Sequence, residues 1–442
     1  MVLCDTTSAA ADPGVPLTTT TTTPSAGPAE RTATAGGIAA AVGTTAANVL
    51  SYGLSLAGAR LLAPAEYGVL VALLAVTLVA SVPALALQAV VAVRVVRASG
   101  ADRRRVTAQS IGLGLAAGAV MLVVGLAAAP VLERFLALAG PQEAIWVAVA
   151  VGATTVLAVL QGVAQGRQDF HRLALILVVY AGLRLAGGLA GLLVFDSVAG
   201  TLAGVAAGVA VSVLVAWVLT GRPRPARGRW QVGELLVACQ ALAGLYLLTN
   251  LDPVLARHYL PATEAGLYGA GAVLAKAAFF LPQAVVLVLF PRLASSPRPG
   301  RTLWLGLAAL TGLGLVMTAV TRLAGGLAVT AVGGAAYQEL AAHAYLFVAV
   351  GSALGVVQLL LYAQLTADRA HATIAVWAVV AGEAAVVATI AHGSLVEVVS
   401  AALGTALVAA VLGLAWTARI TAGRDAPAAD PAIATPPRPR SP

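Results

Sequence analysis

The sequence predicts an all-α protein that crosses a membrane about twelve times, as two six-helix lobes around a central cavity. Three observations predict this fold class: the composition, the recurrence of charge-free windows, and an internal repeat. Of the 442 residues, 60% are hydrophobic and only 10% are charged, and the mean hydropathy is +0.93. Average soluble domains carry about 25% charged residues, so a soluble chain of this composition could not cover its surface with polar groups. The composition therefore predicts a polytopic membrane protein.

Both ends of the chain have a composition that is typical of disorder. Residues 1–34 hold the run Thr18–Thr23 among Pro, Ala, Ser and Gly, and residues 421–442 are rich in Pro and Ala. Segments with so few large apolar residues cannot bury a core. The rest of the chain divides into an N-lobe over 35–220, a basic interlobe loop over 221–231 and a C-lobe over 232–420.

The predicted spans are windows without Asp, Glu, Lys or Arg. A helix needs about 20 apolar residues to cross a bilayer. Three windows are interrupted by a single charge: 173–195 by Arg184, 265–291 by Lys276 and 370–396 by Glu383. With the uninterrupted windows they make six spans in each half. The uninterrupted windows are 32–59, 67–93, 106–132, 144–166, 197–221, 235–251, 302–321, 340–367 and 398–418.

The arginines between the spans predict the orientation in the membrane. With the N-terminus in the cytoplasm, the inner side holds seventeen arginines and the outer side holds four. Such a bias in short loops sets topology by the positive-inside rule. We therefore expect a multi-pass protein of the plasma membrane with both termini in the cytoplasm. The inner set is Arg94, Arg97, Arg103, Arg104, Arg105, Arg167, Arg172, Arg222, Arg224, Arg227, Arg229, Arg292, Arg298, Arg301, Arg369, Arg419 and Arg424; the outer set is Arg60, Arg134, Arg257 and Arg322.

A motif near the start of each half repeats at a nearly constant distance. Arg60, Pro64, Glu66, Gly68, Pro83 and Arg94 recur as Arg257, Pro261, Glu264, Gly266, Pro282 and Arg292, with offsets of 197 to 199 residues. A repeat of this length fits a transporter built from two similar halves. Because six spans per half is an even number, the halves should be related by an axis along the membrane normal.

The second copy of this motif carries ionisable residues and prolines within apolar sequence. Asp252 and Lys276 fall where a charge at membrane depth is costly and usually faces a cavity or a partner. Prolines open the backbone hydrogen bonds of a helix, which is tolerated beside other protein or water. Kinks are expected at Pro83, Pro253 and Pro282.

Polar side chains share faces of several predicted helices. Asn250 and Arg257 fall within about 60° of each other, and Tyr268, Lys276 and Gln283 form a second stripe. Such stripes fit a wet cavity that binds an anionic headgroup, because an arginine fork or a lysine point charge suits phosphate. The candidate substrate-binding residues are Asn48, Arg60, Arg184, Asn250, Arg257, Tyr268, Lys276 and Gln283.

Each of these residues also has a structural interpretation. Arg60 and Arg257 lie near span ends and can extend to lipid headgroups. Asp252 is either an ion-pair partner of Lys276 or a proton or sodium site. Glu383 is either a counter-ion for Arg184 or a second coupling-ion site.

Several classes of function lack their sequence signals. The chain has no Walker lysine loop, nucleotide-binding domain or metal-ligand cluster, which argues against an ATP-driven pump and against an enzyme. Cys4 and Cys239 form no disulfide framework and no metal-binding spacing. The net charge of +8 arises in the loops between spans, so we expect no nucleic-acid partner. No cofactor is expected apart from a coupling ion, H+ or Na+.

The repeated segments resemble the polysaccharide (oligosaccharide-lipid) flippase family of the multidrug/oligosaccharidyl-lipid/polysaccharide exporter superfamily. The resemblance is carried by A-R-L-L-A-P-A-E-Y-G-V-L at 59–70 and V-A-V-R at 91–94. In the second half it is carried by L-D-P-V-L-A-R-H-Y-L at 251–260, A-G-L-Y at 265–268 and F-F-L-P-Q at 279–283. It extends over about residues 36–420.

This resemblance implies two lobes around a V-shaped cavity and transfer of an undecaprenyl-diphosphate-linked glycan from the inner to the outer leaflet for cell-surface polysaccharide biosynthesis. It implies that Arg60, Arg257 and Lys276 hold the diphosphate. Twelve spans, where lipid II flippases have fourteen, favour a glycan repeat unit as substrate. Besides membrane lipids, a polysaccharide polymerase and glycosyltransferases are the expected partners.

Three other functions remain open from the sequence. A drug or cation antiporter of the same superfamily would depend on Asp252 or Glu383 more than on the arginines. A membrane-bound glycan polymerase or glycosyltransferase would need a longer outer loop than any expected here. A scaffold that recruits envelope enzymes would work without its cavity arginines.

Overall fold

The computed structural model describes residues 28–228, 232–294, 299–365 and 369–425, and every element among them is helical. In the first half of the chain the elements are α1 (Pro28–Leu61), α2 (Pro64–Ala80), α3 (Val82–Arg97), α4 (Gly100–Leu136), α5 (Gln142–Gly166), α6 (Phe170–Phe195) and α7 (Val198–Leu219). In the second half they are α8 (Val232–Leu248), α9 (Leu251–Tyr259), α10 (Ala262–Ala294), α11 (Pro299–Gly333), the 3-10 helix η1 (Gly334–Ala342), α12 (Ala344–Leu365), α13 (Arg369–Thr389) and α14 (Leu395–Asp425).

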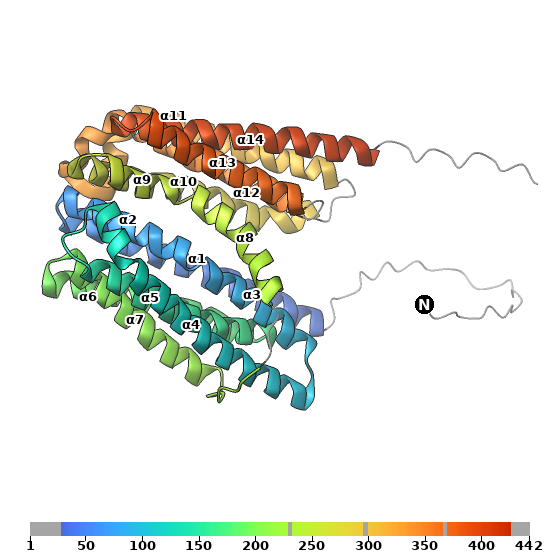
Figure 1. Cartoon of the computed structure of the whole chain (residues 1–442). Coiled ribbons are helices and arrows are strands. Elements are labelled where there is room, and N and C mark those ends of the chain that lie inside the picture. The colour runs from blue at the N-terminus through green and yellow to red at the C-terminus, as the bar shows by residue number, and fades with distance from the viewer. Residues whose placement is uncertain (1–27, 229–231, 295–298, 366–368, 426–442) are drawn as a thin grey trace, which may run out of the picture.

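Eight helical stretches in the described part of the chain are long and apolar enough to cross a membrane. They are α2 with α3, then α4, α5, α6, α7, α11 with η1, α12 and α14. The helices α1, α8 with α9, α10 and α13 also run along the bundle (Figure 1). The predicted all-α polytopic membrane fold is confirmed.

The outermost helices extend beyond the predicted lobe boundaries. Helix α1 begins at Pro28 rather than near residue 35, since proline suits the first turn of a helix. Helix α14 continues to Asp425, past the predicted boundary at 421. Residues 1–27 and 426–442, including Cys4 and the threonine run, lie outside the described residues.

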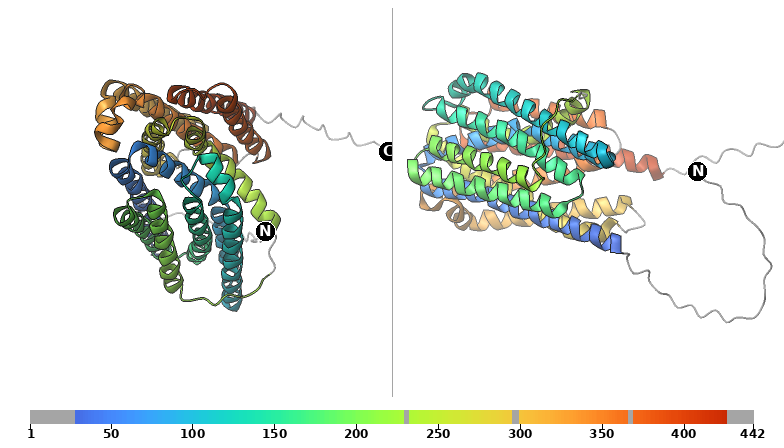
Figure 2. Two further views of the ribbon diagram at one scale, coloured as in Figure 1. Left: turned by 60° about the vertical axis from the view of Figure 1, so that its left-hand side comes forward. Right: turned by 90° about the horizontal axis from the view of Figure 1, so that it is seen from below.

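Helices of each half pack mainly on one another, as the views in Figures 1 and 2 show. In the first half α6 packs on α7 and α1, and α5 packs on α3, α4 and α7; in the second half α12 packs on α10, α11 and α14. The two halves meet where α2 packs on α9 and α10 and where α3 packs on α8.

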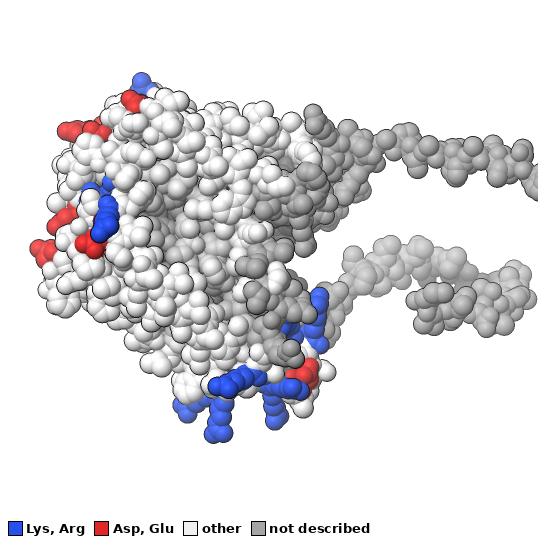
Figure 3. Space-filling model, viewed as in Figure 1, with Lys and Arg blue, Asp and Glu red and all other residues white. Residues whose placement is uncertain are grey.

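The two ends of the bundle differ in charge. At one end, exposed arginines come from the end of α3, the start of α4, the first turn of α6 and the segment after α7; we call it the basic end (Figure 3). At the opposite end, which we call the far end, acidic and basic side chains are mixed (Figure 3). The described exposed arginines of the basic end are Arg97, Arg103, Arg104, Arg105, Arg172, Arg222, Arg224 and Arg227.

The segment 222–228 after α7 runs back along α4. The amide of Ala226 donates to the carbonyl of Ala108 over 2.9 Å, and the indole of Trp217 donates to the carbonyl of Pro223 over 3.2 Å. The predicted interlobe loop therefore begins attached to the first half.

The repeated motif forms the contact between the halves at the far end. Helices α2 and α10 cross at Gly68 and Gly266, which occupy equivalent positions in the repeat. A Cβ on Gly266 would lie 1.8 Å from the carbonyl oxygen of Pro64, so only glycine fits at this crossing. The repeat found in the sequence is thus a structural contact in which each copy packs against the other.

Two of the three predicted kinks coincide with helix interruptions. Pro83 stands in the first turn of α3, directly after the break at Ser81, and Pro253 stands in the first turn of α9, after the break at Thr249 and Asn250. Helix α10 continues through Pro282 without interruption.

Candidate functional site

A cluster of polar side chains is buried in the second half of the chain. Asp252 comes from α9, Tyr268 from α10 and Glu383 from α13, and their exposed fractions are 7%, 0% and 2%. The hydroxyl of Tyr268 donates to Oδ2 of Asp252 over 2.8 Å. Glu383 lies within electrostatic range of both Asp252 and Tyr268. Burial of acidic groups is costly, so such a cluster marks a place where the protein holds charge for a purpose.

The break between α8 and α9 positions Asp252. The side chain of Asn250 turns back and donates to the carbonyl of Tyr246 over 2.9 Å and to the hydroxyl of Thr249 over 3.0 Å. Asp252 follows in the first turn of α9, where the helix dipole favours a negative charge. The Oδ1 atom of Asn250 is buried and has no partner among the described residues. The break between the helices thus places the carboxylate of Asp252 and the unpartnered side-chain oxygen of Asn250 close together in the chain.

Two cations from opposite halves lie beside this cluster. Lys276 stands eight residues after Tyr268 on α10, and its charge interacts with that of Asp252. Its charge also interacts with that of Arg184, which lies on α6 in the first half. Among the described residues, the direct ion pair is Arg172–Asp169 at the basic end. Lys276 and Asp252 do not form a direct ion pair, and their charges interact at longer range. Two like charges within electrostatic range of each other favour the binding of an anion near both.

Aromatic rings connect the halves at the same depth of the bundle. Tyr52 of α1 lies edge-on to Phe280 of α10, with ring centroids 5.7 Å apart. Phe280 in turn contacts Phe279, with centroids 4.8 Å apart. Phe280 lies one turn after Lys276 on α10, so this part of α10 faces α1 of the first half.

The other predicted site residues are divided among different places. Arg60 and Arg257 lie at the far end, where each donates hydrogen bonds to backbone carbonyls of the opposite half. Asn48 is exposed on α1. The side chain of Gln283 lies outside the described part of α10. The structure therefore brings Arg184, Asn250, Tyr268 and Lys276 toward one region with Asp252 and Glu383, and sets the two repeated arginines apart from it.

His258 is a far-end residue that the sequence reasoning missed. Its ring stacks on Phe135 of α4 with centroids 4.0 Å apart and planes 4° from parallel, and its Nδ1 lies 2.6 Å from the carbonyl oxygen of Phe135. The signal in the sequence was its place directly after Arg257 in the repeated motif.

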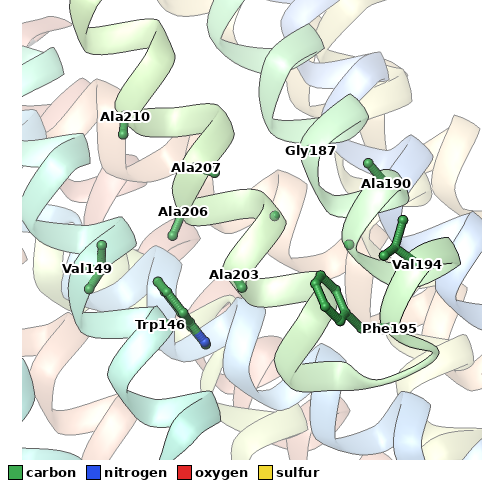
Figure 4. A pocket seen from close by; sticks show the side chains of 12 residues that line it. Trp146, Val149, Gly187, Ala190, Val194, Phe195, Ala203, Ala206, Ala207 and Ala210 are labelled. Carbon is green, nitrogen blue, oxygen red and sulfur yellow. The ribbon is translucent and has the colours of Figure 1, made fainter.

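A separate hollow of about 620 Å³ lies on the first half, between α5, α6 and α7 (Figure 4). Its wall is made of small and apolar residues such as Gly187, Ala203 and Phe195, with the indole of Trp146 at one side. None of the predicted site residues lines it, and it offers no charged group for a phosphate. The buried charge cluster is therefore the candidate site.

Comparisons with known proteins concern the family and the fold of this chain. A family model described as "Polysaccharide biosynthesis protein" matches residues 58–304, more than half of the chain. Among solved structures, the chain is similar to an inward-facing multidrug resistance MATE family transporter of the MOP superfamily, with 14% identity and a TM-score of 0.68, over 87% of this chain and 96% of that one. It is also similar to the lipid II flippase MurJ in an inward closed conformation, with 12% identity and a TM-score of 0.63, over 87% of each chain. No curated protein matches the sequence.

At these identities the solved structures show a shared fold, and the family match rests on the sequence itself. The matched region runs from the end of α1 into α11 and includes both copies of the repeated motif. The chain belongs to the polysaccharide biosynthesis protein family, and it has the fold of the MOP-superfamily transporters.

Proposed function

We propose that this protein is a flippase that moves an undecaprenyl-diphosphate-linked oligosaccharide from the inner to the outer leaflet of the plasma membrane by alternating access. The observation that carries the proposal is that Arg184 and Lys276, one cation from each half of a charge-poor membrane protein, lie within electrostatic range of each other and beside a buried carboxylate. A diphosphate supplies the negative charge that such a pair lacks, and both halves would grip it together.

The charge of the basic end supports an orientation with that end in the cytoplasm. The pKa of Arg167, at this end, is lowered below its ordinary value. The larger cause is partial burial, and the charges of Arg172 and Arg103 lower it further. A dense positive rim fits the cytoplasmic side by the positive-inside rule. Both termini would then be cytoplasmic, and the far end, where the halves are in contact, would face outward.

In this arrangement the substrate enters from the cytoplasmic leaflet. The diphosphate moves between the halves toward Lys276 and Arg184, while the prenyl chain stays in lipid at the side of the bundle. Rocking of one half on the other then closes the basic end and opens the far end. The breaks at Ser81 and at Asn250 give α2–α3 and α8–α9 places to bend during this change.

The carboxylates of the cluster suit a coupling ion, H+ or Na+. Asp252 attracts Lys276, so a cation bound at Asp252 or Glu383 would reduce this attraction and leave Lys276 free for the diphosphate. The unpartnered Asn250 oxygen adds a neutral ligand beside Asp252. Ion uptake and substrate binding would thus be linked through one lysine.

The lipid II flippase among the similar structures is named for a lipid-linked substrate, which agrees with this proposal. The alternative is a drug or cation antiporter, since the MATE relative is named for multidrug resistance and Asp252 and Glu383 are buried acids. Both readings are of transporters rather than enzymes. As partners, glycosyltransferases would build the lipid-linked glycan before it is flipped, and a polysaccharide polymerase would use it afterwards.

A binding measurement separates the two transporter functions. In lipid nanodiscs, undecaprenyl diphosphate should raise the Tm of the protein saturably, because a ligand at 100 times its Kd stabilises the native state by about 2.7 kcal/mol. Undecaprenyl monophosphate should act more weakly, and a lipophilic cation should have no effect. Lys276→Gln should remove the shift, while Arg172→Gln, an exposed cation of the basic end, should keep it. Stabilisation by the cation alone would favour the antiporter.

A further inference from the structure

We propose that Arg60 and Arg257 together form a latch that holds the far end shut. Each arginine caps the carboxyl end of the third membrane pass of the opposite half of the protein. The inference goes beyond the proposed substrate and rests on the proposed alternating access. It concerns the two arginines that the sequence analysis assigns to the cavity and that the structure places at the far end.

The Arg257 side of the latch joins α9 to the end of α4. Nε of Arg257 donates to the carbonyl of Leu136 over 3.0 Å, and Nη2 donates to the carbonyl of Ala137 over 3.2 Å. The next residue, His258, stacks on Phe135 and has its Nδ1 2.6 Å from that carbonyl oxygen. Three successive carbonyls of the first half thus face two adjacent side chains of the second half.

These carbonyls are available because α4 ends in a tight turn. Ala137 has a φ of 48°, and the amides of Ala137 and Leu138 bond to the carbonyls of Arg134 and Glu133. The last carbonyls of a helix have no partner within the helix and carry the negative end of its dipole. A guanidinium that reaches them gains hydrogen bonds and a favourable electrostatic interaction at once.

The Arg60 side repeats this relation with the halves exchanged. Nη2 of Arg60, at the end of α1, donates to the carbonyl of Ala331 in the last turn of α11 over 2.8 Å. The residue after α11, Gly334, has a φ of 75°. Arg60 and Arg257 are 197 residues apart (257 − 60), and so are Ala137 and Gly334 (334 − 137). Each contact therefore joins a repeated arginine to the end of the corresponding helix of the other half. Arg257 reaches the carbonyls of Leu136 and Ala137, whereas Arg60 reaches the carbonyl of Ala331, earlier in the last turn than Gly334.

The position of the latch suits a contact that opens and closes. Both contacts lie at the far end, where α2 and α10 also cross at Gly68 and Gly266. Arg60 is exposed and Arg257 is half-buried, so water can replace their hydrogen bonds when the halves separate. Charged contacts at partly exposed sites have modest strength, which a gate that breaks in every cycle requires.

Distances across the far end test the latch without any substrate. We would place spin labels at Val131 of α4 and Ile390, just after α13, both highly exposed, in a background with Cys4 and Cys239 replaced by serine. The protein would be held in nanodiscs and measured by double electron-electron resonance. The parent protein should show mainly the short distance. The double variant Arg60→Gln, Arg257→Gln should raise the ratio of long to short distances by about tenfold.

Controls make the outcome decisive. Arg134→Gln removes an exposed arginine from the last turn of the same helix, and it should leave the distances unchanged. If the double variant does not fold, each single variant should show a smaller opening. A folded double variant with the parent distance distribution would overturn the latch. Because no substrate is present, this result is independent of whether the protein flips a lipid-linked glycan.

Discussion

Replacing both Lys276 and Arg184 by glutamine should lower transport of a polyprenyl-diphosphate glycan by at least about 100-fold. Each cation would make charge-assisted hydrogen bonds to the diphosphate, worth about 1.5–3 kcal/mol, and 1.4 kcal/mol corresponds to a factor of ten. Each single variant should lose about tenfold or more. The initial rate of transport in proteoliposomes, measured at equal amounts of inserted protein, gives these factors.

The conservative variant Lys276→Arg separates charge from packing at this position. It keeps the positive charge and should retain much of the activity, whereas Lys276→Met keeps the apolar stem and should be as inactive as glutamine. Arg172→Gln, at the basic end, serves as the matched loss of one cation and should transport normally. Normal transport by the Lys276→Gln protein would remove the cation pair from the binding site.

The double variant Asp252→Asn, Glu383→Gln should lose the response of transport to an imposed ion gradient. Both side chains are buried, and their charges lie within electrostatic range of each other, so they are the described acids best placed to bind a coupling ion. The side-chain oxygen of the asparagine can still accept the hydrogen bond that the hydroxyl of Tyr268 donates, so this local contact is kept. Substrate exchange without a gradient should persist, while gradient-driven accumulation should fall to the level of protein-free vesicles.

Proton and sodium gradients applied separately identify the ion. The single variant Asp252→Asn should also destabilise the protein, because it removes the negative charge of Asp252 from the half-buried Lys276. Adding Lys276→Gln to it should recover part of the lost Tm but no transport. A double acid variant that still accumulates substrate in response to a gradient would place the coupling ion elsewhere.

Much of this fold follows from composition and spacing. The charge-free windows predict the passes because a bilayer demands apolar segments of fixed length, and the repeat at offsets of 197 to 199 residues predicts two similar halves. Asp252, Lys276, Arg184 and Glu383 were identifiable because a charge within an apolar window is rare enough to require an explanation.

The partners of Arg60 and Arg257 could not be predicted in the same way. Their acceptors are backbone carbonyls at the ends of α4 and α11, and a carbonyl leaves no trace in the sequence of side chains. The left-handed turn at Ala137 is also hidden, since alanine gives no signal for a positive φ. Pro282 shows a third limit, because α10 stays helical through a residue that opens its hydrogen bonds.

Leaflet exchange in proteoliposomes tests the central claim most directly. Vesicles would contain an undecaprenyl-diphosphate oligosaccharide with a fluorescent sugar in both leaflets, and a membrane-impermeant quencher would be added outside. With the parent protein the quenched fraction should rise from about half to nearly all, and with Lys276→Gln it should rise more slowly, by about tenfold or more. A quenched fraction that stays at half for the parent protein with several glycans, under either a proton or a sodium gradient, would contradict the flippase.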